Sequence, residues 1–185
     1  AILDAATERF AEKSVANVSV EEIIEAADVS RGTFYKLFRH KEDVLTEILR
    51  PFMQGYSAKL AAIETTDPLQ IIDEIIAVYV QIWRDAPTAF SLMQREAAEF
   101  YHLLKDAHQP IVTHMRRLFQ IIEPHGILRA DRAEDAVTLM ARSAVVVLRV
   151  FDGRPDWERL FGDSMRGLLL KTNPATRPAT EDSHP

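Results

Sequence analysis

The sequence SRGTFYKLFRHKE (Ser30–Glu42) gathers positive charge in a chain that is acidic as a whole. Arg31, Lys36, Arg39 and Lys41 stand here with no acid between them, whereas the 185-residue chain has a formal net charge of −6. Glycine and aromatic residues are placed among these cations. Binding to DNA requires a basic patch and does not require a basic protein. The stretch therefore predicts a helix that contacts nucleic acid, although a charged run of this kind is also typical of a solvated helix face.

Two short helices with a turn between them are predicted around this stretch. Ser19 is placed as an N-cap, Glu22 three residues later completes a capping box, and this helix is expected to end near Ala27. Ser30 is a second N-cap, for a helix that is expected to end near Leu37. Short helices joined by a turn of about three residues are typical of the helix-turn-helix motif.

The rest of the chain also follows helical periodicity, and no strand pattern is found. Further helices are expected over about residues 2–13, from 41 onward, over 69–83 and 87–104, in a segment that includes Pro110 and ends near 124, and over 133–151 and 156–170. Residues 172–185 are rich in proline and poor in apolar residues, so a disordered tail is expected there. The sequence thus predicts an all-α chain of about nine helices, with a helix-turn-helix head over residues 1–49 and a second domain over residues 50–171.

The composition excludes several classes of protein. With 47% hydrophobic residues the chain can form a core, and without cysteine it has no disulfides, thiolate metal sites or cysteine nucleophiles. No apolar run of 18 residues occurs, so the protein is expected to be soluble and cytoplasmic. Glu99 and His102 have the Glu-x-x-His spacing of half a carboxylate di-iron site, but the second such motif is lacking. No metal, cofactor or enzymatic activity is therefore expected.

The segment ILDAATERFAEKSVANVSVEEIIEAADVSRGTFYKLFRHKEDVL (residues 2–45) closely resembles the N-terminal domain of TetR-family transcriptional regulators. The resemblance implies that the third helix reads DNA, that the fourth touches phosphate at its start, and that a variable C-terminal domain binds a small ligand and dimerises. The family usually has glycine where Asp28 stands, and aspartate tolerates the left-handed backbone of such a turn better than most residues. By position, the residues implied in DNA contact are Ser19, Ser30, Arg31, Thr33, Tyr35, Lys36 and Lys41.

Large and polar side chains surround the nearly all-apolar helix expected over residues 69–83. A cavity lined by aromatic groups with one or two polar anchors is typical of small-ligand sites, whereas the same residues at helical spacing also suit a plain core. Together with the family resemblance, this pattern makes six residues candidates for a ligand pocket: Tyr79, Trp83, Met93, Glu96, Phe100 and Tyr101. The chemical identity of the ligand does not follow from them.

The last two predicted helices are too apolar to bury only one face each. Two such helices suit a two-fold, four-helix dimer interface, and two-fold dimers match palindromic DNA sites; the alternative is that both helices close the core of the monomer. The residues expected at the interface are Val137, Ala141, Ala144, Leu148, Trp157, Phe161, Met165 and Leu168. Pro51 either kinks the fourth helix or marks the start of a new one.

The sequence therefore predicts a homodimeric transcriptional regulator, a repressor that a small molecule releases from a palindromic operator in double-stranded DNA. One alternative is a constitutive DNA-binding protein without a ligand. The other is an all-α metalloenzyme that uses Glu99 and His102.

Overall fold

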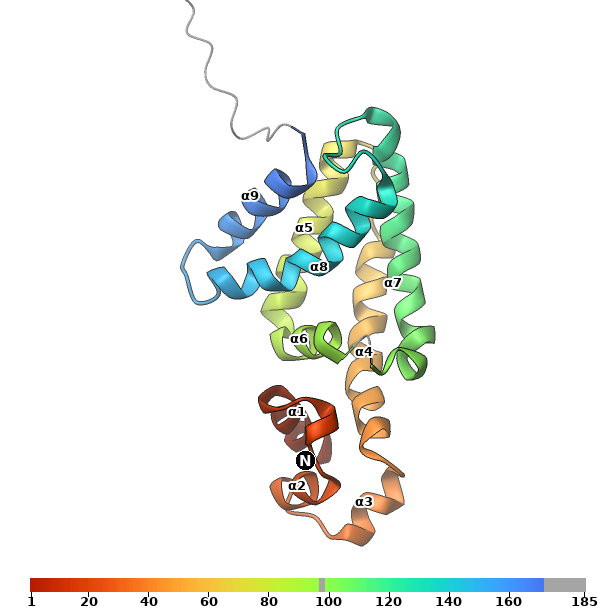
Figure 1. Cartoon of the computed structure of the whole chain (residues 1–185), viewed down its shortest axis with the longest axis vertical. Helices are drawn as coiled ribbons and strands as arrows, with labels where there is room; N and C mark the ends of the chain where they lie inside the picture. Colours follow the sequence, from red (N-terminus) through yellow and green to blue (C-terminus); the bar gives the residue numbers. More distant parts are fainter. Residues whose placement is uncertain (97–98, 172–185) are drawn as a thin grey trace, which may run out of the picture. The chain divides into compact units, whose positions relative to one another are not determined.

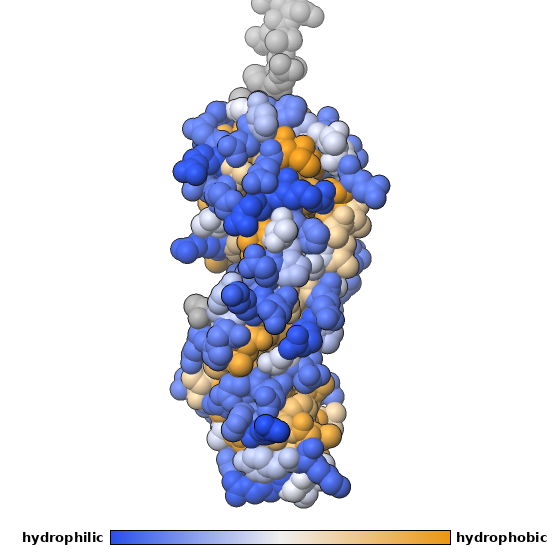
Figure 2. Space-filling view, turned by 90° about the vertical axis from the view of Figure 1, so that its right-hand side faces the viewer, coloured by the Kyte–Doolittle hydropathy of each residue, from blue (hydrophilic) through white to orange (hydrophobic). Residues whose placement is uncertain are grey.

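The computed structural model describes residues 1–96 and 99–171, and these residues form nine α-helices and two 3₁₀ turns without a strand (Figure 1). The expected all-α fold is confirmed. An isolated bridge pairs Leu128 with Leu170. Within the same residues, no helix is long and apolar enough to cross a membrane. On the face drawn in Figure 2, hydrophilic side chains predominate and hydrophobic ones form separate patches between them.

The chain divides into two compact units that do not follow the order of the sequence. The first unit comprises residues 1–64 and 78–115, and the second comprises residues 65–77 and 116–185, of which 172–185 are outside the described residues. The expected tail therefore cannot be compared with the structure. The expected domain boundary after residue 49 stays a prediction, since a single helix runs through this point.

The N-terminal head contains α1 (Ile2–Glu12), a 3₁₀ turn (Val15–Asn17), α2 (Val20–Ala26) and α3 (Arg31–Leu37). These bounds confirm the helices expected from the capping residues and the apolar spacing. α1 packs against α2 and against α4 (Lys41–Ala61), and α2 packs against α3. The fully or almost fully buried residues around which the head folds are Ala6, Phe10, Val15, Val18, Ile23, Phe34, Val44 and Leu45.

α4 (Lys41–Ala61) is one continuous helix with Pro51 inside it. Proline has no N–H to donate to the carbonyl group of Glu47, which costs an interior hydrogen bond. Pro51 and Glu47 both lie on the solvent side of the helix, where water can satisfy this carbonyl group. The alternative that one helix ends and another begins at Pro51 is therefore wrong.

Three further helices follow: α5 (Pro68–Asp85), α6 (Pro87–Glu96) and α7 (Tyr101–Ile122). The helix expected over 87–104 ends earlier, and α7 begins before the expected position and includes Pro110 in its interior. Both Asp106, which loses its hydrogen-bond partner, and Pro110 are exposed, so this proline is tolerated as Pro51 is. The sequence around residue 100 contains no proline or glycine that would have marked the break.

The second unit is built on α8 (Ala133–Phe151) and α9 (Trp157–Leu169), which pack against each other. A β-carbon added at Gly162 would lie 3.6 Å from Ile76 Cγ2, so α9 also approaches the first half of α5 closely. Arg166 Nε donates to Asp73 Oδ1 at 2.8 Å across the same contact. The core of this unit includes Ala136, Met140, Ala144, Leu148, Phe161 and Met165.

Candidate DNA-binding site

The first turn of α3 is fixed by its N-cap and lined by small side chains. Ser30 Oγ accepts from the Thr33 backbone N–H at 3.0 Å and lies 2.9 Å from Thr33 Oγ1, which confirms Ser30 as the cap. A β-carbon added at Gly32 would come no closer than 3.7 Å to Ser30 Oγ. The fold itself does not need glycine here, although glycine costs a helix about 1 kcal/mol relative to alanine. The bare backbone leaves room for another surface to approach.

α3 buries one side chain completely and presents most of the others to solvent. Phe34 is fully buried, and it packs against the half-buried Phe38 with 5.7 Å between the ring centroids. The exposed residues of the helix and its cap are Ser30, Arg31, Gly32, Thr33, Tyr35, Lys36 and Leu37. This exposed set includes every residue of the helix and its cap that the resemblance implies in DNA contact.

The two cations of α3 have different surroundings. Arg31 Nη2 donates to Glu21 Oε1 on α2, and Arg31 Cζ lies 5.9 Å from the centroid of the Tyr35 ring. Lys36 is exposed and has no hydrogen bond or ion pair with any residue that the structure describes. Lys36 therefore has its full charge available for a phosphate group, whereas the charge of Arg31 is balanced by a carboxylate.

Lys41 begins α4 and holds the loop that precedes α2. Its Nζ donates to the carbonyl oxygen of Val18 at 2.7 Å and to that of Ala16 at 2.9 Å. An ammonium group has three donors, so one N–H remains for a phosphate oxygen. The structural role of Lys41 was missed in the sequence, where nothing links it to residues more than twenty positions earlier. Its phosphate contact stays a prediction.

The start of α2 is held by the expected capping box. The Ser19 N–H donates to Glu22 Oε2 at 2.8 Å, and the Glu22 N–H donates to Ser19 Oγ at 3.2 Å. Lys13 Nζ also donates to Glu22 Oε1, at 2.5 Å. The bond from Lys13 and those from Ser19 lower the pKa of the Glu22 carboxyl to about 2, from its ordinary 4.5. The Ser19 side chain is thus engaged within the head, and its contact with DNA stays a prediction.

The turn between α2 and α3 has the expected left-handed residue. Asp28 has φ 50°, and its N–H donates to the carbonyl oxygen of Glu25 at 3.2 Å. The N–H of Val29 donates to the carbonyl oxygen of Ile24 at 3.2 Å. The turn therefore keeps its geometry without glycine.

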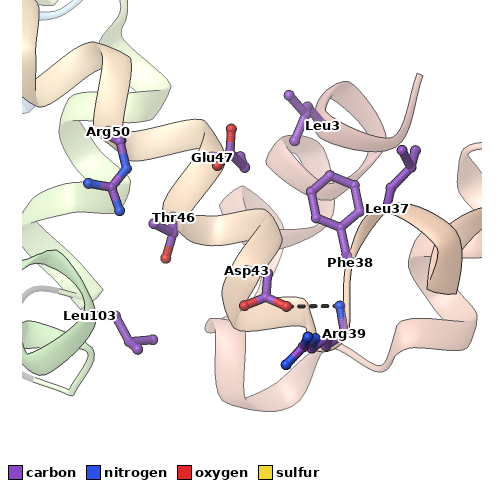
Figure 3. Close-up of a pocket in the computed structure, with 9 residues that line it drawn as sticks. All are labelled: Leu3, Leu37, Phe38, Arg39, Asp43, Thr46, Glu47, Arg50 and Leu103. Carbon is purple, nitrogen blue, oxygen red and sulfur yellow. Dashed lines mark hydrogen bonds between the residues drawn. The ribbon is translucent and has the colours of Figure 1, made fainter.

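A groove of about 700 Å³ lies beside the start of α4 (Figure 3). Asp43 Oδ2 accepts from the backbone N–H groups of Arg39 at 2.8 Å and His40 at 3.0 Å, which places a negative charge at the positive end of α4. The lining residues are Leu3, Leu37, Phe38, Arg39, Asp43, Thr46, Glu47, Arg50 and Leu103. None of them is a residue expected in the ligand pocket.

Two of the candidate ligand residues belong to a packed aromatic cluster. The rings of Tyr79 and Phe90 lie 5.6 Å apart, those of Tyr56 and Tyr79 lie 5.7 Å apart, and Trp83 lies 6.5 Å from Phe90. Burial raises the pKa of Tyr79 to about 12 and that of Tyr56 well above its ordinary value. The cluster is therefore buried within the first unit, and ligand contact by Tyr79 and Trp83 stays a prediction.

The other candidates near the α6–α7 junction differ in exposure. Met93 and Phe100 are buried, whereas the Tyr101 side chain is exposed and its ring lies 5.9 Å from that of His108. His108 Nδ1 is buried and has no hydrogen-bond partner among the described residues, and burial lowers the pKa of this imidazole. Ligand contact by Met93, Phe100 and Tyr101 stays a prediction.

Glu96, the expected polar anchor of the pocket, has its partners within the protein. Its side chain is almost fully buried, and Oε1 accepts from Arg95 Nε at 2.8 Å and, more weakly, from the Val15 N–H at 3.4 Å. The Arg95 guanidinium also donates to the carbonyl oxygens of Phe10 and, at 3.0 Å, Lys13. α6 is thus bonded to the C-terminal end of α1. No local pattern indicated this contact, because more than eighty residues separate the partners.

The eight residues expected at the dimer interface differ in burial, and their place in an interface stays a prediction. Four of them are fully buried within the single chain and pack in the core of the second unit: Ala144, Leu148, Phe161 and Met165. The other four are half-buried: Val137, Ala141, Trp157 and Leu168. Val146 and Val150, which were not among the expected interface residues, are 62% and 68% exposed on α8. The two faces of α8 are both apolar, and composition alone does not tell which one faces inward.

Glu99 and His102, the residues of the alternative metalloenzyme, are both exposed. Among residues 1–96 and 99–171, no group of three or more histidine, aspartate or glutamate side chains is placed to hold a metal ion.

An amphipathic helix with an exposed basic face, capped and preceded by a second short helix and a tight turn, is the arrangement of a helix-turn-helix motif. Residues 2–48 match the family of bacterial regulatory proteins called the tetR family. The head thus matches the N-terminal domain of the tetR family, and the resemblance seen in the sequence is confirmed over these residues.

Relatives and solved structures agree with this assignment. The HTH-type transcriptional regulator RutR of Escherichia coli K12 is 33% identical over 107 residues, which are 57% of this chain and 50% of RutR. The chain thus spans about half the length of the curated relatives it matches. A tetR-family protein from Rhodococcus RHA1 has a TM-score of 0.71 at 20% identity, covering 90% of this chain and 92% of that one. AibR, solved with isovaleryl coenzyme A and operator DNA, has a TM-score of 0.72 at 16% identity, covering 90% and 95%. At these identities the structures show a shared fold.

Proposed function

We propose that this chain is a cytoplasmic transcriptional repressor that binds operator DNA as a homodimer and leaves it when a small molecule binds. In this proposal it is a regulator and has no enzymatic activity. The observation that carries the proposal is the exposed face of α3, where Arg31, Thr33, Tyr35 and Lys36 surround a bare glycine backbone. A helix of this kind fits the major groove, with the first turn near base edges and Lys36 near phosphate.

Dimerisation is assigned to a stripe of α8 that the monomer does not cover. Leu139, Ser143, Val146 and Val150 follow one another at helical spacing, and the two valines are the most exposed of them. α9 adds the half-buried Trp157, Leu160, Ser164 and Leu168. Small and apolar residues on two neighbouring helices suit a two-fold, four-helix contact. A two-fold dimer would place two α3 helices on the two halves of a palindromic site.

The effector is proposed to act through the first unit, where α6 is bonded to α1 by Arg95. The six candidate pocket residues stand on α5, α6, α7 and the junction between the last two helices. AibR was solved with an acyl-coenzyme A and with DNA, so acyl-coenzyme A thioesters are the first effectors to test. A ligand that changes DNA affinity must interact differently with the DNA-bound and the released states.

A constitutive DNA-binding protein without an effector is the second candidate. The dense aromatic cluster of Tyr56, Tyr79, Trp83 and Phe90 favours it, because these side chains fill the space between α4, α5 and α6. If this candidate is correct, no acyl-coenzyme A will change the affinity for a selected DNA site. Repression by an effector-released regulator requires a loss of affinity, typically 5- to 150-fold.

The proposal is tested with duplexes that the parent protein selects from a random-sequence pool. Thr33→Ala should change the selected sequence, with a loss of about 1–3 kcal/mol if a base contact disappears. Lys36→Ala should weaken binding to selected and unrelated duplexes by the same factor and lower the salt slope by about 0.9. Lys59→Ala, in the last turn of α4, is the control. If the parent selects no sequence, the proposed function is wrong.

A further inference from the structure

Glu21 and Arg31 form an ion pair between the first turns of the two helices of the helix-turn-helix. Arg31 Nη2 donates to Glu21 Oε1, and both side chains are largely exposed. Ser19 caps α2 and Ser30 caps α3, so the first turn of each helix is fixed, and the two helices pack against each other. The pairing is therefore a consequence of how the motif is built, and it lies on the helix proposed to read DNA.

Three acidic residues line a cavity together with Arg31. A cavity of about 310 Å³ between α2 and α3 is lined by Glu21, Ile24, Glu25, Asp28, Val29 and Arg31. Of the acids in this lining, only Glu21 is bonded to the guanidinium group. The ring of Tyr35 lies on another side, 5.9 Å from Arg31 Cζ. A protein that bound DNA by charge alone would gain nothing from three carboxylates beside a cation of its reading helix.

A guanidinium group has five N–H donors in a planar fork, and Glu21 engages Nη2. The donors that remain can still pair with the O6 and N7 acceptors of a guanine. With a carboxylate beside it, however, Arg31 carries little net charge toward a phosphate group. An unpaired arginine could contact either a base or a phosphate group. The pair with Glu21 leaves Arg31 able to contact a base but weakens its attraction to phosphate.

We infer that Glu21 is a positioning residue for sequence recognition: it orients Arg31 toward a base and suppresses its sequence-independent contact with phosphate. The inference rests on the proposed function. Glu21 affects binding through Arg31 and does not itself touch the DNA. Removing its charge should therefore strengthen binding to unrelated DNA while it weakens the preference for the selected site.

The test compares Glu21→Gln with the parent on two duplexes of equal length, one selected by the parent from a random pool and one unrelated. The affinity of Glu21→Gln for the unrelated duplex should rise, and its salt slope should steepen by about 0.9 per protomer, as for one added phosphate contact. The ratio of the two affinities should fall by about fivefold or more, the lower limit for a lost bidentate base contact. Circular dichroism checks that the variant is folded.

Glu25→Gln is the matched control, because it removes the same charge from the same cavity wall but no bond to Arg31. It should raise both affinities by the same factor and leave their ratio unchanged. In an Arg31→Ala background, Glu21→Gln should no longer change the ratio. Equal behaviour of Glu21→Gln and Glu25→Gln would overturn the inference, since it would show a general charge effect. A parent that selects no sequence overturns the proposed function and this inference with it, whereas an unchanged ratio in Glu21→Gln overturns the inference alone.

Discussion

Arg95 and the buried carboxylate of Glu96 are neighbours in sequence whose side chains pair at 2.8 Å, and the same guanidinium bonds to the last carbonyl groups of α1. Glu96 is 2% exposed and Arg95 is 37% exposed. Truncating the arginine would leave a buried carboxylate without its counter-ion. Loss of Arg95 should therefore destabilise the fold more than loss of the Glu96 charge, because Arg95 is partly exposed to water and Glu96 is not.

Arg95→Ala should lower the free energy of unfolding by about 3 kcal/mol, the cost of leaving a buried charge unpaired. Adding Glu96→Gln to this variant should restore part of the loss, because a neutral amide is cheaper to bury. Urea unfolding of the parent, both single variants and the double variant gives the coupling. Arg116→Ala, which breaks an exposed pair with Glu134, is the control and should cost much less, because water screens an exposed pair. Equal losses in the two arginine variants would contradict the assigned role.

Val146→Glu should convert the proposed dimer into a folded monomer, because the stripe on α8 would bury a charge without a partner. Sedimentation velocity measures the oligomeric state, and tight binding to the selected duplex should be lost with it. Thr138→Glu adds the same charge to α8 at an exposed position away from the stripe and should leave the dimer intact. A dimeric Val146→Glu variant would show that the interface lies elsewhere.

Pro51→Ala should stabilise α4, since proline in a helix interior is disfavoured by up to about 3 kcal/mol relative to alanine. It should also change the ratio of operator affinities measured with and without an effector, because the helix can then no longer flex at the missing hydrogen bond. Gly55→Ala is the matched control in the same helix: its β-carbon would meet nothing within 4 Å, so it adds helix propensity only. If the parent, Pro51→Ala and Gly55→Ala all show the same ratio of operator affinities, Pro51 has no part in the response to the effector.

Glu22→Gln should make the head less stable at pH 7 and have progressively less effect as the pH falls. The pKa of Glu22 is lowered to about 2 in the folded chain, so its contribution is fully present above the ordinary value of 4.5. The contribution is lost between pH 4.5 and 2, because the unfolded chain takes up a proton there and the folded chain does not. Thermal unfolding of parent and variant at pH 7, 3.5 and 2 should therefore converge; a constant difference would contradict the lowered pKa.

The helices of the head could be predicted from sequence because their signals are local. Ser19, Glu22 and Ser30 act within one turn of their own helix, and each cap is found where the pattern placed it. Asp28 was likewise expected to adopt a left-handed backbone because the turn requires it.

Contacts across the fold could not be predicted in the same way. The bond from Lys41 to Val18, that from Arg95 to Phe10 and that from Arg31 to Glu21 depend on how helices are placed side by side. The core and outer faces of α8 differ too little in hydropathy to be told apart, so Leu148 was assigned outward although it is fully buried. A capping residue thus reveals its function in the sequence, whereas an ion pair between helices does not.

The missing hydrogen bond at Pro51 has a mechanical consequence for the DNA end of α4. Lys41, which is bonded to the head, stands ten residues before Pro51, and ten helical residues span about 15 Å. Over this arm, a bend of about 10° at the proline would displace the start of the helix by about 2.6 Å. That displacement is close to the length of a hydrogen bond, so a bend of this size would be enough to break the proposed contacts of the head with DNA.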